Sequence, residues 1–167
     1  MLIRFGPLVL AAILLGLESF SVVGCSPISD NKKLDAPASN WLKVEAGAFS
    51  IYAPPGWKFR QRQGIDSFVG EFAGDGVVLD FDYGLYSNPL ADDNEPTYVV
   101  THETIGGYKA RIVRPSVAGH GITGIYFPEI ASGNKLCLHG QNLTDTQREL
   151  ALRIFRTIRF SSAPPLR

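Results

Sequence analysis

The strongest constraint on the fold is a series of short segments between residues 48 and 139 in which apolar and polar residues alternate. Runs of about four to eight alternating residues, bounded by glycine, proline, asparagine or aspartate, are typical of half-buried strands. The strands predicted in this way are 48–53, 57–63, 66–73, 77–83, 98–105, 108–113, 122–127 and 135–139. The turn signals between them favour an antiparallel sheet of about six to eight strands.

One amphipathic helix follows the strands. Thr144 to Gln147 has the pattern of a capping box, in which Thr144 caps the first turn and Gln147 reaches back to it. Glu149 and Arg153 are placed for an i,i+4 ion pair. The apolar stripe consists of Leu150, Ala151, Ile154, Phe155 and Ile158, and the cations that suit the negative end of the helix dipole are Arg153, Arg156 and Arg159. The sequence therefore predicts an α+β fold with a C-terminal helix packed on the sheet.

Composition and charge limit the partners of this chain. Hydrophobic residues make up 45% of it, which is enough for a genuine core, and the formal net charge is zero. Without a basic excess, neither a nucleic-acid partner nor polybasic attraction to anionic lipid is expected. The length suits one domain, which we place at residues 41–160.

Residues 1–24 have the pattern of a secretory signal peptide. Arg4 gives a positive start, residues 5–17 are apolar, and Glu18 ends the run. This run is shorter than the roughly 20 apolar residues that cross a bilayer, so a permanent transmembrane helix is not expected.

The tetrad Val22-Val23-Gly24-Cys25 resembles the lipobox of bacterial lipoproteins. The resemblance implies cleavage between Gly24 and Cys25, a diacylglycerol on the Cys25 thiol and acylation of the new amine. Ser26 stands where relatives held at the inner membrane often carry aspartate, so the outer membrane, facing the periplasm, is favoured. The alternative is an ordinary signal peptide, cut elsewhere, with an incidental cysteine.

The segments that flank the expected domain contain few large apolar residues. Residues 25–40 are polar and proline-containing, and are expected to form a flexible tether from the lipidated cysteine. Residues 161–167 are expected to be a disordered tail. With Cys25 lipidated, Cys137 has no partner for a disulfide, and its apolar surroundings predict a buried, unreactive thiol.

Two segments resemble the PsbP-like superfamily, which includes an extrinsic subunit of photosystem II. They are AFSIYAPPGWKF (48–59) and TQRELALRIFRTIRF (146–160), while GIDSFVGEF and LDFDYGLYSNP between them resemble small bacterial lipoproteins. The resemblance implies an α/β/α sandwich with an antiparallel sheet between helices. It also implies a role in binding proteins or in assembly, and it carries over no catalytic motif.

A hairpin at residues 66–83 is expected to collect acidic side chains on one face. With Gly74-Asp75 as a two-residue turn, Glu71 lies opposite Val78, and Asp80 lies opposite Val69. Glu71, Asp80 and Asp82 then share the face opposite the apolar one. The preceding strand presents Lys58, Arg60 and Arg62, and two interpretations remain: the bases neutralise the acids, or the carboxylates hold a cation or a basic ligand.

The segment from residue 84 to residue 97 is the best candidate for recognition, since it exceeds the usual length of a connection. It carries Tyr86, Leu90 and the acids Asp92, Asp93 and Glu95. These acids are candidates to complete a cation site with Glu71, Asp80 and Asp82, because hard cations prefer oxygen ligands. The segment lacks EF-hand spacing, however, and no metal or cofactor is predicted.

Enzymatic signals are weak in this sequence. His102, His120 and His139 show no HExxH spacing and no zinc-binding pattern with cysteine. A GxSxG elbow and a phosphate-binding glycine loop are also absent from the sequence. A non-catalytic binding or assembly module at the cell envelope, with a membrane anchor and a protein partner, is therefore expected. The alternatives are a lipoprotein that binds a cation or small ligand, and a hydrolase with a distributed site; the oligomeric state stays open.

Overall fold

The computed structural model describes residues 37–93 and 95–161, and within them it contains ten strands and one α-helix. The expected signal peptide, Cys25, the tether up to residue 36 and the tail from residue 162 lie outside the described residues. Among the residues that are described, no helix has the length and apolar character needed to cross a membrane.

A seven-stranded antiparallel sheet forms one layer. Its order is β3-β4-β5-β9-β8-β7-β6. The bounds are β3 (Lys58–Gln61), β4 (Phe68–Gly74), β5 (Val77–Gly84), β6 (Tyr98–Ile105), β7 (Tyr108–Pro115), β8 (Ile122–Phe127) and β9 (Lys135–Gln141). The predicted α+β class, with an antiparallel sheet and a C-terminal helix, is confirmed.

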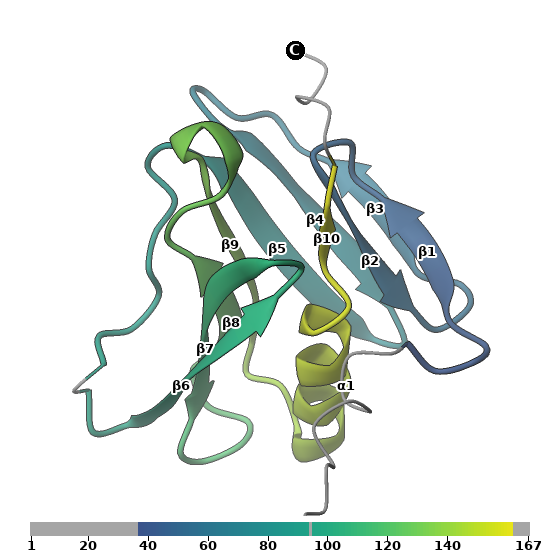
Figure 1. The fold of residues 1–167 in the computed structure, drawn as a ribbon. Coiled ribbons are helices and arrows are strands. Elements are labelled where there is room, and N and C mark those ends of the chain that lie inside the picture. The colour runs from purple at the N-terminus through teal and green to yellow at the C-terminus, as the bar shows by residue number, and fades with distance from the viewer. Residues whose placement is uncertain (1–36, 94, 162–167) are drawn as a thin grey trace, which may run out of the picture. The chain divides into compact units, whose positions relative to one another are not determined.

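A second layer covers one face of this sheet (Figure 1). It consists of α1 (Asp145–Phe155) and a three-stranded sheet of order β1-β2-β10, with β1 (Leu42–Glu45), β2 (Phe49–Ala53) and β10 (Arg159–Phe160). A single sheet was expected, and this expectation is wrong for β2. Pro54 and Pro55 follow β2, and proline lacks the N–H that a strand ladder needs. The chain therefore leaves the three-stranded sheet at these prolines and enters the seven-stranded sheet at β3.

The core lies between the two layers. Phe49 of β2 is fully buried, and its ring lies 5.7 Å from the ring of Phe72 and 5.1 Å from that of Phe81 on the larger sheet. α1 contributes Ala151, Ile154 and Phe155, which are also fully buried. The remaining fully buried side chains of the two sheets include Ile51, Leu79, Ile125, Leu136 and Leu138. Both layers are therefore joined by apolar contacts.

The capping box of α1 is confirmed, since Thr144 and Gln147 cap each other reciprocally. The helix ends at Phe155, although its apolar periodicity continues to Ile158. Thr157 explains the early end: its hydroxyl accepts a hydrogen bond of 2.8 Å from the N–H of Tyr52 and donates one of 2.6 Å to Ile154 O. The chain is thereby directed into β10, which pairs with β2.

The i,i+4 pairing expected for α1 is replaced by another contact. The guanidinium of Arg153 lies 4.8 Å from the centre of the Trp41 ring, a cation–π geometry. Arg156, at the C-cap, donates to both carboxylate oxygens of Glu103 on β6, at 3.0 and 2.8 Å. These arginines attach the helix to other elements instead of only solvating it.

The turn between β4 and β5 lies one position later than expected. It is formed by Asp75 and Gly76, which have φ values of 51° and 70°. A type I′ turn requires positive φ at both central residues, and an Asp-Gly pair adopts this conformation more readily than Gly-Asp. Glu71 therefore lies directly opposite Asp80 and not opposite Val78. The register shift amounts to two positions, so each side chain keeps its expected face.

Candidate functional site

The face of the seven-stranded sheet that points away from the second layer carries most of the polar side chains of interest, and we call it the outer face. Paired positions on neighbouring strands place side chains next to one another. One row across this face consists of Arg60, Glu71, Asp80, His139 and Gly124, and the next consists of Val69, Asp82, Cys137, Tyr126, Arg111 and His102.

Glu71 is the most buried charged residue of the outer face, with an exposed fraction of 1%. Arg60 donates to Glu71 Oε1 from Nε at 2.7 Å and also from Nη2, and Arg62 donates to Oε2. Arg62 additionally pairs with Asp80 at 2.8 Å. The hydrogen bonds from Arg60, assisted by Arg62, hold the pKa of Glu71 below its ordinary value despite the opposing effect of burial. These arginines occupy the positions at which a cation would approach Glu71 and Asp80.

The low pKa of Glu71 predicts a pH-dependent contribution to stability. A carboxyl group whose pKa falls on folding stabilises the fold above its unfolded pKa, here 4.5, and this contribution is lost as the pH falls through the folded pKa. The Glu71→Gln variant is expected to be less stable than the wild type at pH 7. We expect this difference to shrink as the pH falls below 4.5.

Urea denaturation from pH 7 to pH 3 measures this effect. The exposed Glu149 provides the control, because Glu149→Gln is expected to leave the pH profile unchanged. A Glu71→Gln protein that loses stability on acidification as steeply as the wild type would contradict the assignment.

The other acids of the expected cation site lie apart. Asp82 has a buried Oδ1 atom without a hydrogen-bond partner among the described residues, next to Cys137. Asp93 lies at β7, where Oδ1 is 2.8 Å from Arg111 Nε. Asp92 is exposed. No group of three or more histidine, cysteine or acidic side chains in residues 37–93 and 95–161 is arranged to hold a metal ion.

Cys137 and His139 form the only close sulfur–imidazole pair in the described part of the chain, with Sγ 3.6 Å from Nδ1. Burial, reinforced by the charge of Asp82, raises the pKa of the Cys137 thiol to about 12. Burial also lowers the pKa of His139, against the opposing charge of Asp80. Both groups are therefore neutral at pH 7, so the pair lacks the thiolate that nucleophilic catalysis requires. The expected burial of Cys137 is confirmed.

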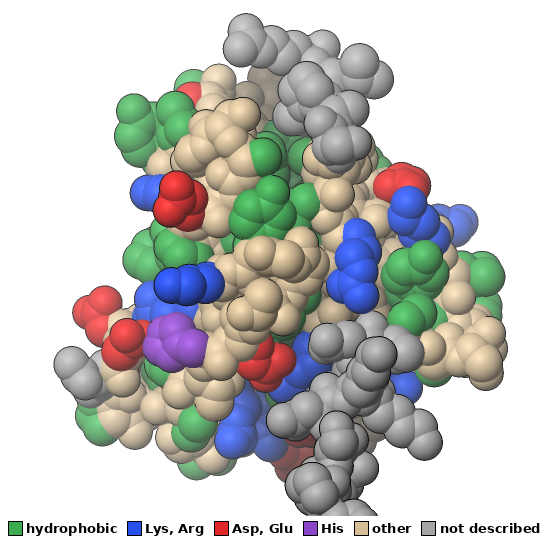
Figure 2. Space-filling view, viewed as in Figure 1, with side chains coloured by type: hydrophobic (Ala, Val, Ile, Leu, Met, Phe, Trp, Pro, Cys, Tyr) green, Lys and Arg blue, Asp and Glu red, His purple; other side chains and the backbone are tan. Residues whose placement is uncertain are grey.

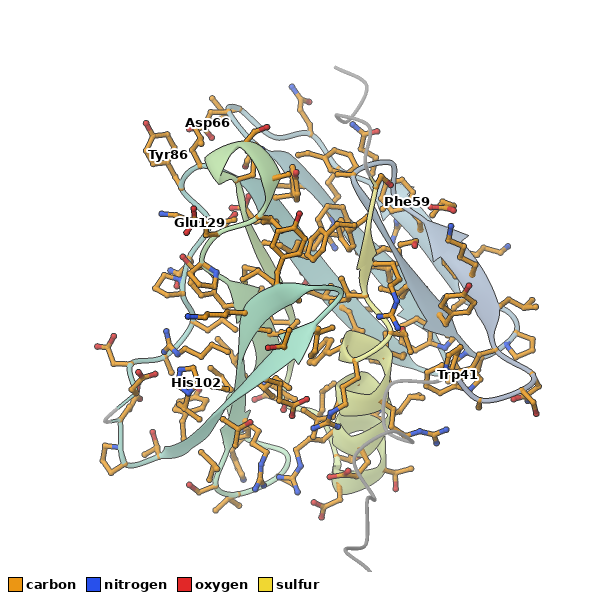
Figure 3. The ribbon with its side chains drawn as sticks, viewed as in Figure 1. Trp41, Phe59, Asp66, Tyr86, His102 and Glu129 are labelled. Atoms are coloured by element: carbon orange, nitrogen blue, oxygen red, sulfur yellow. The ribbon has the colours of Figure 1, made fainter. Side chains whose placement is uncertain are left out.

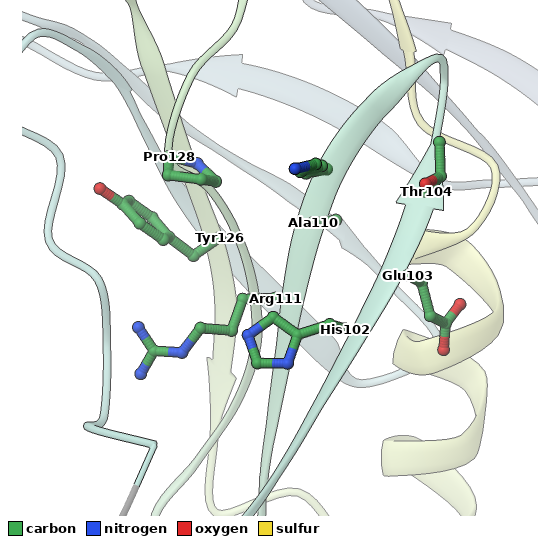
Figure 4. A pocket seen from close by; sticks show the side chains of 8 residues that line it. His102, Glu103, Thr104, Ala110, Arg111, Tyr126 and Pro128 are labelled. Carbon is green, nitrogen blue, oxygen red and sulfur yellow. The ribbon is translucent and has the colours of Figure 1, made fainter.

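A pocket of about 540 Å³ opens on the outer face where β6, β7 and β8 meet. His102, Arg111 and Tyr126 point to the same side of the sheet, whereas Glu103 points the other way, towards α1 (Figure 4). Thr104, Lys109 and Pro128 also line it. In Figure 2 a histidine is visible between basic and acidic side chains on this side of the molecule.

Sequence reasoning missed this pocket. Lys109 and Arg111 are two positions apart in one predicted strand, so their side chains are expected to share a face. Tyr126 comes from a distant segment, however, and only the strand order β8-β7-β6 brings it beside Arg111.

The β5–β6 loop, residues 85–97 with residue 94 outside the described part, lies over the outer face. Leu90 packs on the bare backbone of Gly124, where an added Cβ would lie 2.6 Å from Leu90 Cδ1. Leu90 itself has a φ of 75°, and its N–H is bound by the Asn88 side chain at 2.8 Å. Ala91 is 7% exposed. This packing brings the end of the loop, with Asp93, to the pocket.

The start of the same loop is exposed. Leu85 and Tyr86 have exposed fractions of 53% and 80%, and Ile65 in the β3–β4 connection is fully exposed at 105%. Tyr86 and Asp66, the neighbour of Ile65, lie beside each other at one end of the molecule (Figure 3). A Cβ added to Gly84, the last residue of β5, would lie 2.8 Å from the Ser67 Cβ, so the β3–β4 connection lies against the end of β5, directly before Leu85. We call Ile65, Leu85 and Tyr86 the apolar tip.

The three histidines occupy separate places. His102 lies at the pocket, with Nε2 at 4.0 Å from Asp93 Oδ2, and its side chain is 65% exposed. His120 is exposed in the β7–β8 connection, and His139 is half-buried beside Cys137. The residues that line the pocket beside this histidine–carboxylate contact include no serine or cysteine.

Comparisons with protein-family models, with curated proteins and with solved structures find no match for this chain. The functional argument therefore rests on the residues and their geometry.

Proposed function

We propose that this protein is a lipid-anchored, non-catalytic protein-binding module of the bacterial cell envelope, related in fold to the PsbP-like superfamily. The fold relationship is supported by the antiparallel sheet with its C-terminal helix and by the Pro-Gly-Trp turn after β2. The α/β/α arrangement of that superfamily has helices on both faces of the sheet, whereas the α-helix of the described residues covers one face.

The anchor is supported by the lipobox-like sequence that ends at Cys25. Cleavage before Cys25 and acylation of this residue leave residues 26–40 as the tether of the folded domain. Several acyl chains, at about 0.8 kcal/mol for each buried methylene, hold a protein at a bilayer almost irreversibly. We place the protein at the outer membrane, facing the periplasm.

The observation that carries the binding role is the exposure of the apolar tip. Single exposed hydrophobic residues are common on protein surfaces and need no explanation. Here three large exposed side chains come from neighbouring segments: Ile65 from the β3–β4 connection, which lies against the end of β5, and Leu85 and Tyr86 from the residues directly after β5. Tyrosine and large aliphatic side chains gain most when a partner removes them from water, so this tip is suited to insertion into an apolar groove of a protein.

Photo-crosslinking in intact cells tests this role. A photoreactive phenylalanine analogue in place of Tyr86 is expected to give one discrete crosslinked product with an envelope protein. Adding Ile65→Ser is expected to reduce this product at least about tenfold, since a centrally placed apolar contact behaves as a hot spot.

The matched control places the same analogue at Val117, which is 64% exposed in a different connection. We expect no discrete product from position 117. The proposal is contradicted by equal products from positions 86 and 117, or by a product from position 86 that Ile65→Ser leaves unchanged.

A further inference from the structure

The pocket at β6, β7 and β8 carries an excess of groups that bind anions. His102, Lys109 and Arg111 line it on the outer face, together with the aromatic ring of Tyr126. The acid that faces them, Asp93, comes from the β5–β6 loop and not from a strand of the sheet. In the ion pair of Arg111 with Asp93, the cation thus belongs to a strand of the sheet, and the carboxylate belongs to a loop.

Arg111 is not saturated by Asp93. Its side chain is 14% exposed, and Nε lies 2.8 Å from Asp93 Oδ1. Nη2 is buried and has no hydrogen-bond partner in the described part of the chain. A guanidinium offers five N–H donors in a planar arrangement and commonly binds a carboxylate through two of them. Arg111 therefore has the capacity to bind a second or a better placed carboxylate oxygen.

The carboxylate of Asp93 can be displaced from Arg111 by another carboxylate. Its side chain is 56% exposed, and an ion pair between partly exposed groups is weak. The pocket beside it remains open at about 540 Å³, a volume within the range of small-molecule sites.

We propose that this pocket binds a small organic carboxylate, whose carboxylate group takes the place of the Asp93 side chain on Arg111. Lys109 adds positive charge beside the bound group, and the imidazole of His102 offers a further polar contact. Tyr126 and Pro128 form the apolar wall against which the body of the ligand packs. A carboxylate fits better than a bare oxyanion, because Asp93 already shows a carboxylate on Arg111 and because the wall is apolar.

This site is independent of the apolar tip. Tyr86 and His102 lie well apart in Figure 3, and the tip is not part of the pocket lining. The protein-binding role and the carboxylate site therefore succeed or fail in separate experiments.

A titration of the full chain in detergent micelles tests the proposal, with benzoate as the probe and backbone amide chemical shifts of Arg111 and Tyr126 as the readout. We expect saturable shifts. Benzyl alcohol, which has the same apolar body without the carboxylate, is expected to give none. Asp93→Asn is expected to tighten benzoate binding about fourfold, since it removes a competing carboxylate that a weak ion pair holds on Arg111 for part of the time.

Asp92→Asn is the matched control, because it removes the same charge from the same loop. It is expected to change the benzoate affinity by less than about twofold, as a screened surface charge would. The proposal is overturned if benzyl alcohol and benzoate give the same response, or if the two variants have equal effects. Saturation by inorganic phosphate without any response to benzoate would also overturn it.

Discussion

The Phe49→Ala variant is expected to lose about 3–5 kcal/mol of unfolding free energy, the cost of removing a fully buried phenylalanine from a core. Phe49 has no exposed surface, and its ring contacts those of Phe72, Phe81, Tyr83 and Phe160 at centroid distances between 5.1 and 6.4 Å. It is the central aromatic contact between the three-stranded sheet and the seven-stranded sheet. The loss of this ring leaves a cavity at the junction of the two layers. Urea denaturation of the wild type and of Phe49→Ala measures the resulting change in unfolding free energy.

Tyr86→Ala is the control for this experiment. Tyr86 is 80% exposed, so its replacement is expected to change the unfolding free energy by no more than about 0.5 kcal/mol. A loss below about 1 kcal/mol in Phe49→Ala would show that β2 contributes little to the core and would contradict the two-layer packing.

The strands that local patterns specify strongly were predicted well from the sequence. The expected strands 98–105 and 122–127 coincide with β6 and β8. Both segments are rich in β-branched and aromatic residues, and the Gly106-Gly107 turn defines the end of β6. The helix start was equally predictable, since the capping box at Thr144 is a local chemical signal.

The elements that depend on tertiary contacts were not predicted. β1 is four residues long and mostly exposed, and the alternation of its four residues is too short to identify a strand without its pairing to β2. β10 exists because Arg159 and Phe160 pair with Ser50 and Phe49, far away in the chain. Its residues continue the helical periodicity locally, and the hydrogen bonds of Thr157 override that preference.

The sequence predicted which acidic side chains share one face of the sheet, but it did not predict the residues that they contact. Strand alternation alone placed Glu71, Asp80 and Asp82 on one face, and this placement holds because a register shift of two positions preserves the faces. The contacts of Arg60 and Arg62 with these acids depend on the pairing of β3 with β4. The sequence favoured neutralisation of these acids over cation binding, and the contacts of Arg60 and Arg62 agree with it.

The Cys25→Ser variant is expected to move the protein from the membrane pellet to the soluble periplasmic fraction. A serine hydroxyl at this position removes the thiol that would receive the diacylglycerol, and the described domain has no helix that could span a bilayer. Without acyl chains, nothing in the proposed arrangement replaces their anchoring free energy of about 0.8 kcal/mol for each methylene. Fractionation of cells that express each variant measures the change.

Cys137→Ala provides the matched control, because it removes the other cysteine of the chain, which is buried in β9. This variant is expected to remain in the membrane pellet. Release of both variants would show that membrane retention does not depend on Cys25 in particular.

The central claim, a binding domain fixed to the envelope through Cys25, is tested most directly by the intact mass of the exported wild-type protein. We predict a chain that begins at Cys25 and carries the added mass of a diacylglycerol and an amide-linked acyl group. An exported chain with an unmodified Cys25, whether it begins there or elsewhere, would contradict the claim.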